Sequence, residues 1–161
     1  MHSTKTDEEI IESFQTFEND KMSFILSTVD AENTPLTSYA PFIKHENDYF
    51  IAISSKLPHF TNMMQAQKAH VLIIEDEAKA NNIYARKRLY FNVTCSIEND
   101  TEKIFSLFDT RYGDELSFLR DMPDFKVFRL VAGEKSLVLG FGAAYKMNTD
   151  GSLVQKSIQH K

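Results

Sequence analysis

Apolar residues recur along this chain at two spacings, and the change from one to the other predicts the order of helices and strands. Side chains three and four positions apart predict helices at residues 7–19, 58–67, 100–112 and 114–120. Thr6 suits the start of the first helix, and acidic residues fill its first turn. Pro58 suits the start of the second helix, and Gly113 suits the end of the third.

Short apolar runs of strand length lie between these helices. They cover residues 21–29, 36–44, 48–54, 69–75, 88–97, 125–131 and 136–139. In the run at 88–97, apolar and polar side chains alternate, so one face of that strand is expected to be buried. Residues 45–47 predict a hairpin turn, and residues 132–134 are expected to join the last two strands as a pair. Pro41 places its strand at an edge or at a bulge.

The resulting order favours a mainly β fold with flanking helices, of the α+β class. Hairpin connections outnumber crossovers, which indicates an antiparallel barrel or sandwich rather than a parallel doubly wound sheet. We expect one domain over residues 1–161, with an N-terminal helical segment at 1–20 and a C-terminal tail at 148–161.

Composition narrows the possible partners and compartments. A net charge of −5 argues against a nucleic-acid partner, which usually selects a basic face. The single cysteine, Cys95, suits a reducing compartment. No apolar run reaches the ~20 residues that a membrane span needs, and the N-terminus has no apolar signal core. We therefore expect a cytoplasmic protein with neither a membrane nor a nucleic acid as partner.

One group of residues concentrates positive charge in this acidic chain. Arg86, Lys87 and Arg88 stand together at the start of a predicted strand, where they could bind a phosphate or a carboxylate. The alternative is a solvated strand end whose cations pair with the acidic residues at 75–77.

Three weaker signals accompany it, each with a structural alternative. His59, Thr61 and Asn62 lie at a predicted helix N-terminus, where backbone N–H groups attract anions or are simply capped. Gly140-Phe141-Gly142 indicates either close ligand approach or a kink in the barrel. His160 is a possible iron ligand in a tail that can equally be without a role. His45 and His70 are interpreted as a turn residue and a sheet residue, and no Cys/His spacing indicates a zinc site.

Several segments together resemble the HugZ/HutZ-type haem-utilisation proteins, within the pyridoxamine-phosphate-oxidase-like split-barrel superfamily. The matching segments are Ser38 to Phe42, His59 with Thr61-Asn62, Asp76 to Lys79, Ile83 to Leu89, Asp124 to Phe128 and Leu139 to Tyr145. They span roughly residues 20 to 147.

This resemblance implies a homodimer of antiparallel split barrels with ligand sites at the subunit interface. The implied cofactor is haem, with FMN as the alternative. The residues that the resemblance implies around it are Tyr39, His59, Thr61, Asn62, Arg86, Lys87, Arg88, Gly140, Phe141 and Gly142. His160 would be the axial ligand of the haem iron, and Asp124 would orient it, although the tail lacks the Gly/His-rich ending of haem binders.

Three functions follow from the resemblance and stay open at this point. The first is oxidative opening of haem to a biliverdin, with iron release and an external electron donor. The second is an FMN-dependent oxidoreductase, in which Arg86 and Lys87 hold the phosphate. The third is a haem carrier without turnover.

Overall fold

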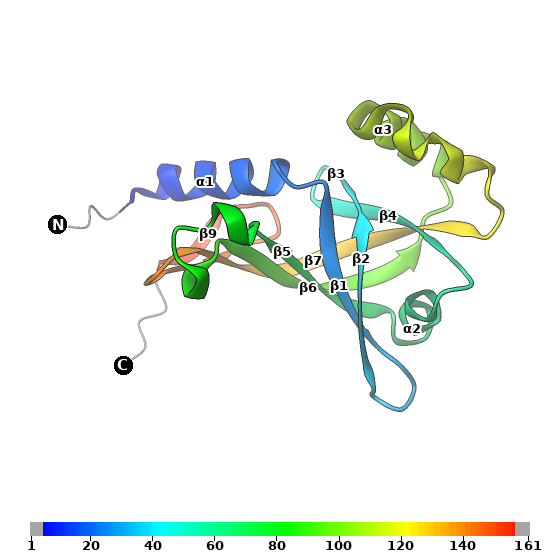
Figure 1. The fold of residues 1–161 in the computed structure, drawn as a ribbon, viewed down its shortest axis with the longest axis horizontal. Helices are drawn as coiled ribbons and strands as arrows, with labels where there is room; N and C mark the ends of the chain where they lie inside the picture. Colours follow the sequence, from blue (N-terminus) through cyan, green and yellow to red (C-terminus); the bar gives the residue numbers. More distant parts are fainter. Residues whose placement is uncertain (1–4, 157–161) are drawn as a thin grey trace.

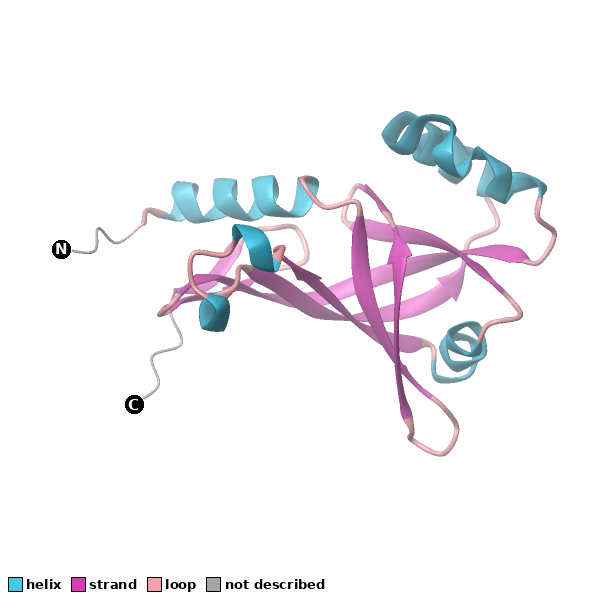
Figure 2. Ribbon diagram, in the orientation of Figure 1, coloured by secondary structure: helices cyan, strands magenta, loops and turns pink. Residues whose placement is uncertain are grey.

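A strongly bent antiparallel sheet dominates the computed structural model, which describes residues 5–156 (Figures 1 and 2). Its strands are β1 Ser23–Val29, β2 Pro35–Pro41, β3 Ile43–His45, β4 Asp48–Ser54, β5 Lys68–Ile74, β6 Arg88–Ile97, β7 Phe125–Gly140, β8 Ala143–Met147 and β9 Leu153–Lys156. The helices are α1 Asp7–Asn19, α2 Pro58–Ala66 and α3 Thr101–Tyr112, with 3₁₀ helices η1 Glu77–Lys79, η2 Ile83–Ala85 and η3 Gly113–Asp121.

The strand order is β2-β1-β5-β6-β7-β4-β3, and β8 and β9 extend the sheet from the second half of β7. Every pairing is antiparallel. The mainly β fold with flanking helices is therefore confirmed. Strand β2 lies at the sheet edge, as Pro41 predicts, because proline cannot donate a ladder hydrogen bond.

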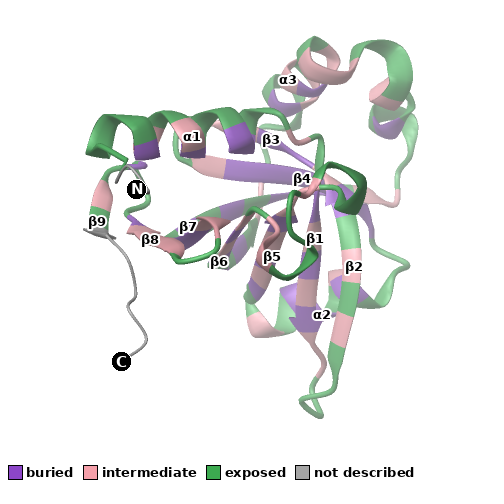
Figure 3. Ribbon diagram, turned by 60° about the vertical axis from the view of Figure 1, so that its left-hand side comes forward, coloured by how far each residue is buried: buried purple, intermediate pink, exposed green. Residues whose placement is uncertain are grey.

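The inner face of the curved sheet forms the main core, and two helices close its ends. Helix α1 covers one end with Ile10, Phe14 and Phe17, and its start is fixed by reciprocal hydrogen bonds between Thr6 and Glu9. Helix α2 packs at the other end, beside the ends of β1 and β6 (Figure 1). Figure 3 shows the buried residues of α1 facing the sheet and the exposed ones facing away.

A second, smaller core lies on the outer side of the sheet. Ile43, Phe50 and Val127 point outward from β3, β4 and the first part of β7. Helix α3 and η3 cover them with residues such as Phe108 and Leu119. This part of the outer face is thus buried within the chain itself.

The predicted turn at residues 132–134 is wrong, because Phe125–Gly140 forms one continuous strand. Val93 pairs with Ala132 and Phe91 pairs with Lys135, so two residues, Gly133 and Glu134, oppose Asn92 in a β-bulge. A glycine followed by an acid predicts a turn from the local sequence, but the long ladder with β6 carries the chain straight on. The bulge reverses the alternation of faces and turns Lys135 into the core.

Three smaller boundaries also differ from the prediction. The run at 36–44 divides into β2 and β3 at Phe42, whose N–H donates to the Tyr112 hydroxyl at 3.0 Å. Residues 113–121 form a 3₁₀ helix, and the tail region from 148 contains β9 beyond its turn at Gly151. None of the helices within residues 5–156 is long and apolar enough to cross a membrane.

Candidate outer-face ligand site

The outer face of β1, β5, β6 and the end of β7 carries apolar residues that no helix of the described chain covers. We call these residues the outer strip: Ile25, Leu72, Ile74, Tyr90 and Val138. Each is of intermediate exposure, whereas the alternating inward residues of the same strands are buried in the main core. Apolar side chains that gather on the outer face of a sheet whose inner face is already packed are expected to meet a ligand or a second chain.

Arg88 stands at one end of the outer strip. It pairs with Ile74 on β5 and with Val138 on β7, so its side chain starts from the same outer face. Its Nη1 donates to the Arg86 carbonyl at 3.1 Å. A half-exposed guanidinium beside an apolar strip is a suitable contact for a flat apolar ligand that carries carboxylates.

Its two basic neighbours have different surroundings. Arg86 donates from Nε and Nη2 to the Glu75 carbonyl, and its Nη1 lies 3.5 Å from Glu77 Oε1. Lys87 contributes instead to a separate pocket of about 520 Å³ between α1 and the sheet, which Lys79 and Phe17 also line. The structure therefore does not gather the three cations around one point within a single chain.

The glycine segment and Tyr39 frame the outer strip from two sides. Gly140-Phe141-Gly142 is the tight turn between β7 and β8, and Gly142 has a φ of 72°, which favours glycine. Phe141 is 81% exposed there. Tyr39, 73% exposed, pairs with Ile25 across β1 and β2 and lies beside the opposite edge of the strip.

The predicted residues around α2 lie at the far end of the barrel from Arg88. Asn62 is buried and donates from Nδ2 to the Thr28 hydroxyl at 3.0 Å. His59 is also buried, and burial lowers the pKa of its ring because the charged form loses hydration. Thr61 is exposed. Asn62 thus has a structural partner, and the described chain brings none of these three to Arg88.

Asp124 lies just before β7, at the opposite end of that strand from Gly140. The Ser54 hydroxyl donates to its Oδ2 at 2.5 Å, and this hydrogen bond lowers the pKa of the Asp124 carboxyl. His160 lies outside the described residues, but β9 ends at Lys156, opposite Tyr145, and runs toward the Gly140–Gly142 turn. Strand β9 therefore ends on the Arg88 side of the sheet, at the opposite end of β7 from Asp124 of the same chain.

Sequence reasoning missed a buried ionic cluster that ties α1 to the barrel. Lys135 is fully buried and donates to the Tyr49 hydroxyl at 2.7 Å, and Tyr49 donates to Glu18 Oε2. Lys44 lies 2.5 Å from the other oxygen of Glu18. In the sequence, Lys135 follows residues that predict a turn, where a charged side chain is ordinarily exposed. Only knowledge of the bulge could have indicated that Lys135 is buried.

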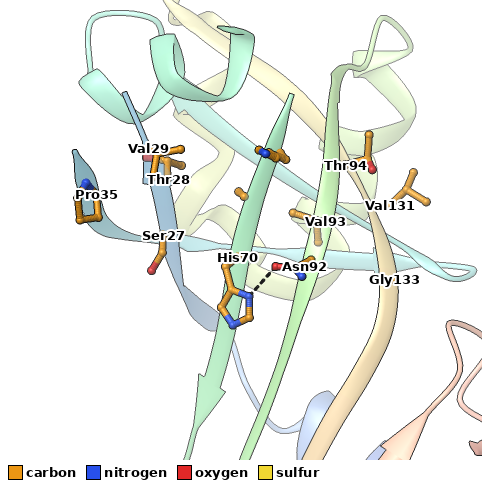
Figure 4. Close-up of a pocket in the computed structure, with 12 residues that line it drawn as sticks. Ser27, Thr28, Val29, Pro35, His70, Asn92, Val93, Thr94, Val131 and Gly133 are labelled. Carbon is orange, nitrogen blue, oxygen red and sulfur yellow. Dashed lines mark hydrogen bonds between the residues drawn. The ribbon is translucent and has the colours of Figure 1, made fainter. Parts of the chain in front are cut away.

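Sequence reasoning also missed the pairing of His70 with Asn92. These two residues face each other across β5 and β6 on the outer face (Figure 4). Both had been identified only as strand residues. Within residues 5–156, no group of three or more His, Cys, Asp or Glu side chains could hold a metal ion by itself.

A bent antiparallel sheet, with a second core on only one half of its outer face, defines this chain as a split-barrel protein. The sequence profile of the pyridoxamine 5'-phosphate oxidase family matches residues 10–138. The chain belongs to that family.

Two relatives are similar over most of the chain. The haem oxygenase HutZ of Vibrio cholerae is 35% identical over 138 residues, which cover 83% of this chain and 78% of HutZ. The crystal structure of HutZ, there called a haem storage protein, superposes with a TM-score of 0.70 at 33% identity over 74% of this chain and 87% of that one. ChuZ of Campylobacter jejuni superposes with a TM-score of 0.87 at 27% identity over 99% of this chain and 68% of that one.

Proposed function

We propose that this protein binds haem on the outer strip, for haem utilisation. The observation that carries the proposal is an uncovered apolar strip that ends at the guanidinium of Arg88. A porphyrin offers a flat apolar ring and two carboxylates, which match these two features. HutZ is called a haem oxygenase in one case and a haem storage protein in the other, and the similarity of this chain to HutZ supports haem as the ligand.

The path of the chain toward its C-terminus supports His160 as an axial ligand. His160 follows Lys156 by four positions, and an extended chain of four residues spans at most ~14 Å. Strand β9 is separated from Arg88, the first residue of β6, by three strand spacings, which also amount to ~14 Å. A histidine at position 160 can therefore reach a ligand that contacts Arg88.

A second copy of the chain would complete the site. The outer strip lies on the half of the sheet that α3 and η3 leave uncovered. An apolar patch of this kind is typical of a subunit interface. Asp124 and the end of β9 lie at opposite ends of β7, so in this proposal the Asp124 that orients His160 comes from the other protomer. The two residue assignments together thus require a homodimer.

The oligomeric state tests this part of the proposal. Leu72→Glu places a charge in the strip, and we expect sedimentation velocity to show a dimer for the unaltered protein and a monomer for the variant. Phe118→Glu is the control, because Phe118 is 52% exposed on η3, away from the strip. A monomeric unaltered protein would contradict the shared site.

Turnover of the haem is a separate part of the proposal. Bound haem iron supplies the oxygen chemistry, and an external donor supplies the electrons. The residues of this chain hold the ring: Arg88 neutralises a propionate, while Leu72 and Tyr90 exclude water from one side. Biliverdin formation on addition of a reductant and oxygen would support an oxygenase, and its absence with intact haem binding would support a carrier.

Titration with haemin, followed by absorbance, tests the binding itself. We expect a saturable Soret band for the unaltered protein and an affinity at least tenfold lower for Arg88→Ala, since a hydrogen bond to a charged group contributes ~1.5–3 kcal/mol. Lys103→Ala, on α3, is the matched control and should bind normally. Uptake of FMN in place of haemin would overturn the proposal in favour of a flavin-binding protein.

We also propose that the protein works in the cytoplasm. Its one cysteine is buried, and burial raises the pKa of the Cys95 thiol to about 12, so no disulfide chemistry is built into the described fold. Cell fractionation with an antibody to the protein would test this, and recovery in a periplasmic or secreted fraction would contradict it.

A further inference from the structure

A pocket of about 540 Å³ opens on the outer face, at the end of the outer strip that lies away from Arg88. Strands β1, β5, β6 and β7 all contribute to it (Figure 4). Its polar lining consists of Ser27, Thr28, Lys68, His70, Asn92 and Thr94. Among these side chains, the imidazole of His70 is the strongest ligand for a transition metal.

The ring of His70 is held in one orientation by its neighbour. Its Nδ1 lies 2.9 Å from Oδ1 of Asn92, the residue directly opposite on β6. Because an amide oxygen only accepts hydrogen bonds, Nδ1 is the nitrogen that carries the proton. In the neutral ring, Nε2 therefore keeps its lone pair.

That second nitrogen is available to a ligand in the pocket. Within residues 5–156, the hydrogen bond to Asn92 is the only one made by the His70 ring. Figure 4 shows the other ring nitrogen pointing away from Asn92. A histidine that donates one N–H to a neighbouring oxygen and leaves the other nitrogen free has the arrangement typical of metal-ligating histidines.

The position of His70 relative to Arg88 suits one extended ligand. Asn92 follows Arg88 by four residues on the same strand, which corresponds to ~13 Å. Tyr90 lies between them on the outer face, and its ring centroid is 6.0 Å from that of His70. A flat ring on Tyr90 and Leu72 would therefore have an acidic edge toward Arg88 and its centre toward His70.

We propose that His70 Nε2 is an axial ligand of the iron when haem binds the outer strip, and that Asn92 is a positioning residue for that ring. This inference rests on the proposed haem binding. It assigns the ligand on the sheet side of the haem.

Spectra of the ferric haemin complex test this assignment without reference to turnover. We expect His70→Ala to shift the Soret band, to remove the low-spin signal in electron paramagnetic resonance, and to lower haemin affinity at least tenfold. Added imidazole should restore the low-spin spectrum, which a merely structural defect would not allow. Asn92→Ala should weaken binding less than His70→Ala does. His45→Ala is the matched control, because His45 flanks the β3–β4 turn and should behave as the unaltered protein does.

The outcomes separate this inference from the proposed function. If the unaltered protein binds haemin and His70→Ala leaves both spectrum and affinity unchanged, the His70 assignment is wrong and haem binding stands. If the unaltered protein does not take up haemin, the proposed function fails, and the inference fails with it. Thermal denaturation by circular dichroism should show the same midpoint for His70→Ala and His45→Ala, because both side chains lie outside the main core.

Discussion

Neutralising Glu18 is the sharpest test of how the barrel and α1 are held together. Glu18 is 2% exposed, and its carboxylate lies 2.5 Å from Lys44 Nζ and 3.7 Å from the fully buried Lys135 Nζ. The substitution Glu18→Gln keeps the shape and removes the charge. Removing one partner of a buried charge pair costs about 3–5 kcal/mol, because the other charge remains without compensation.

The effect should depend on pH in a defined direction. Burial lowers the pKa of Lys135 to about 8, against the opposing influence of Glu18, and Lys44 lowers it further. Between pH 8 and the unfolded value near 10.5, the unfolded chain keeps a proton that the folded chain has released. The burial of charged Lys135 therefore destabilises the fold below pH 8, and this cost is relieved as the pH rises. The loss caused by Glu18→Gln should shrink accordingly between pH 7 and pH 9.5.

Urea denaturation followed by far-ultraviolet circular dichroism measures this loss, since the chain has no tryptophan to report by fluorescence. Glu12→Gln, on the exposed side of α1, is the control and should change the unfolding free energy by less than about 0.5 kcal/mol. Lys135→Met should cost less than Glu18→Gln, because Glu18 then keeps Lys44 and Tyr49 as partners. A loss below about 1 kcal/mol for Glu18→Gln, or one that grows with pH, would refute this account.

Three further predictions concern single groups. Cys95 should resist thiol reagents at pH 8 in the folded protein and react at once in denaturant, because burial raises its pKa to about 12; fast labelling of the native chain would contradict this. Ser54→Ala should raise the pKa of Asp124 toward its usual value, because the hydroxyl that this substitution removes stabilises the ionised carboxyl. A carboxyl NMR titration measures this pKa, and an unchanged value would contradict the prediction. Tyr112→Phe should cost about 1–3 kcal/mol in urea denaturation, because the hydroxyl lies 2.5 Å from the Met22 carbonyl and 2.6 Å from the Phe42 carbonyl; Tyr84→Phe, 85% exposed, should cost nothing measurable.

The periodic parts of the sequence predicted the fold well, because burial acts on each strand and helix locally. The alternation in residues 88–97 identified both β6 and its buried face, and the capping signal at Thr6 placed the start of α1. The bulge at Gly133–Glu134 was not predicted, because it is caused by the long ladder with β6, which lies elsewhere in the sequence. A local glycine signal cannot distinguish a bulge from a turn.

The candidate site was predicted only in part, for a related reason. The basic run at 86–88 lies at one end of the outer strip, but adjacent residues on an extended chain point to opposite faces, so the side chains of Lys87 and Arg88 separate. The pairing of His70 with Asn92 depends on the register of two strands, which no spacing within one segment shows. His59 and Asp124 could be assigned to a common pocket only through the family resemblance.

The most direct test of haem on the outer strip is methyl NMR of the protein loaded with ferric haemin. A paramagnetic iron broadens signals of nearby methyl groups. We expect broadening of the methyl signals of Ile25, Leu72 and Val138. Those of Ile104 on α3 and Val127 beneath it should be unaffected. Broadening confined to the α3 side, or none at the three strip residues in a saturated sample, would show that the cofactor binds elsewhere.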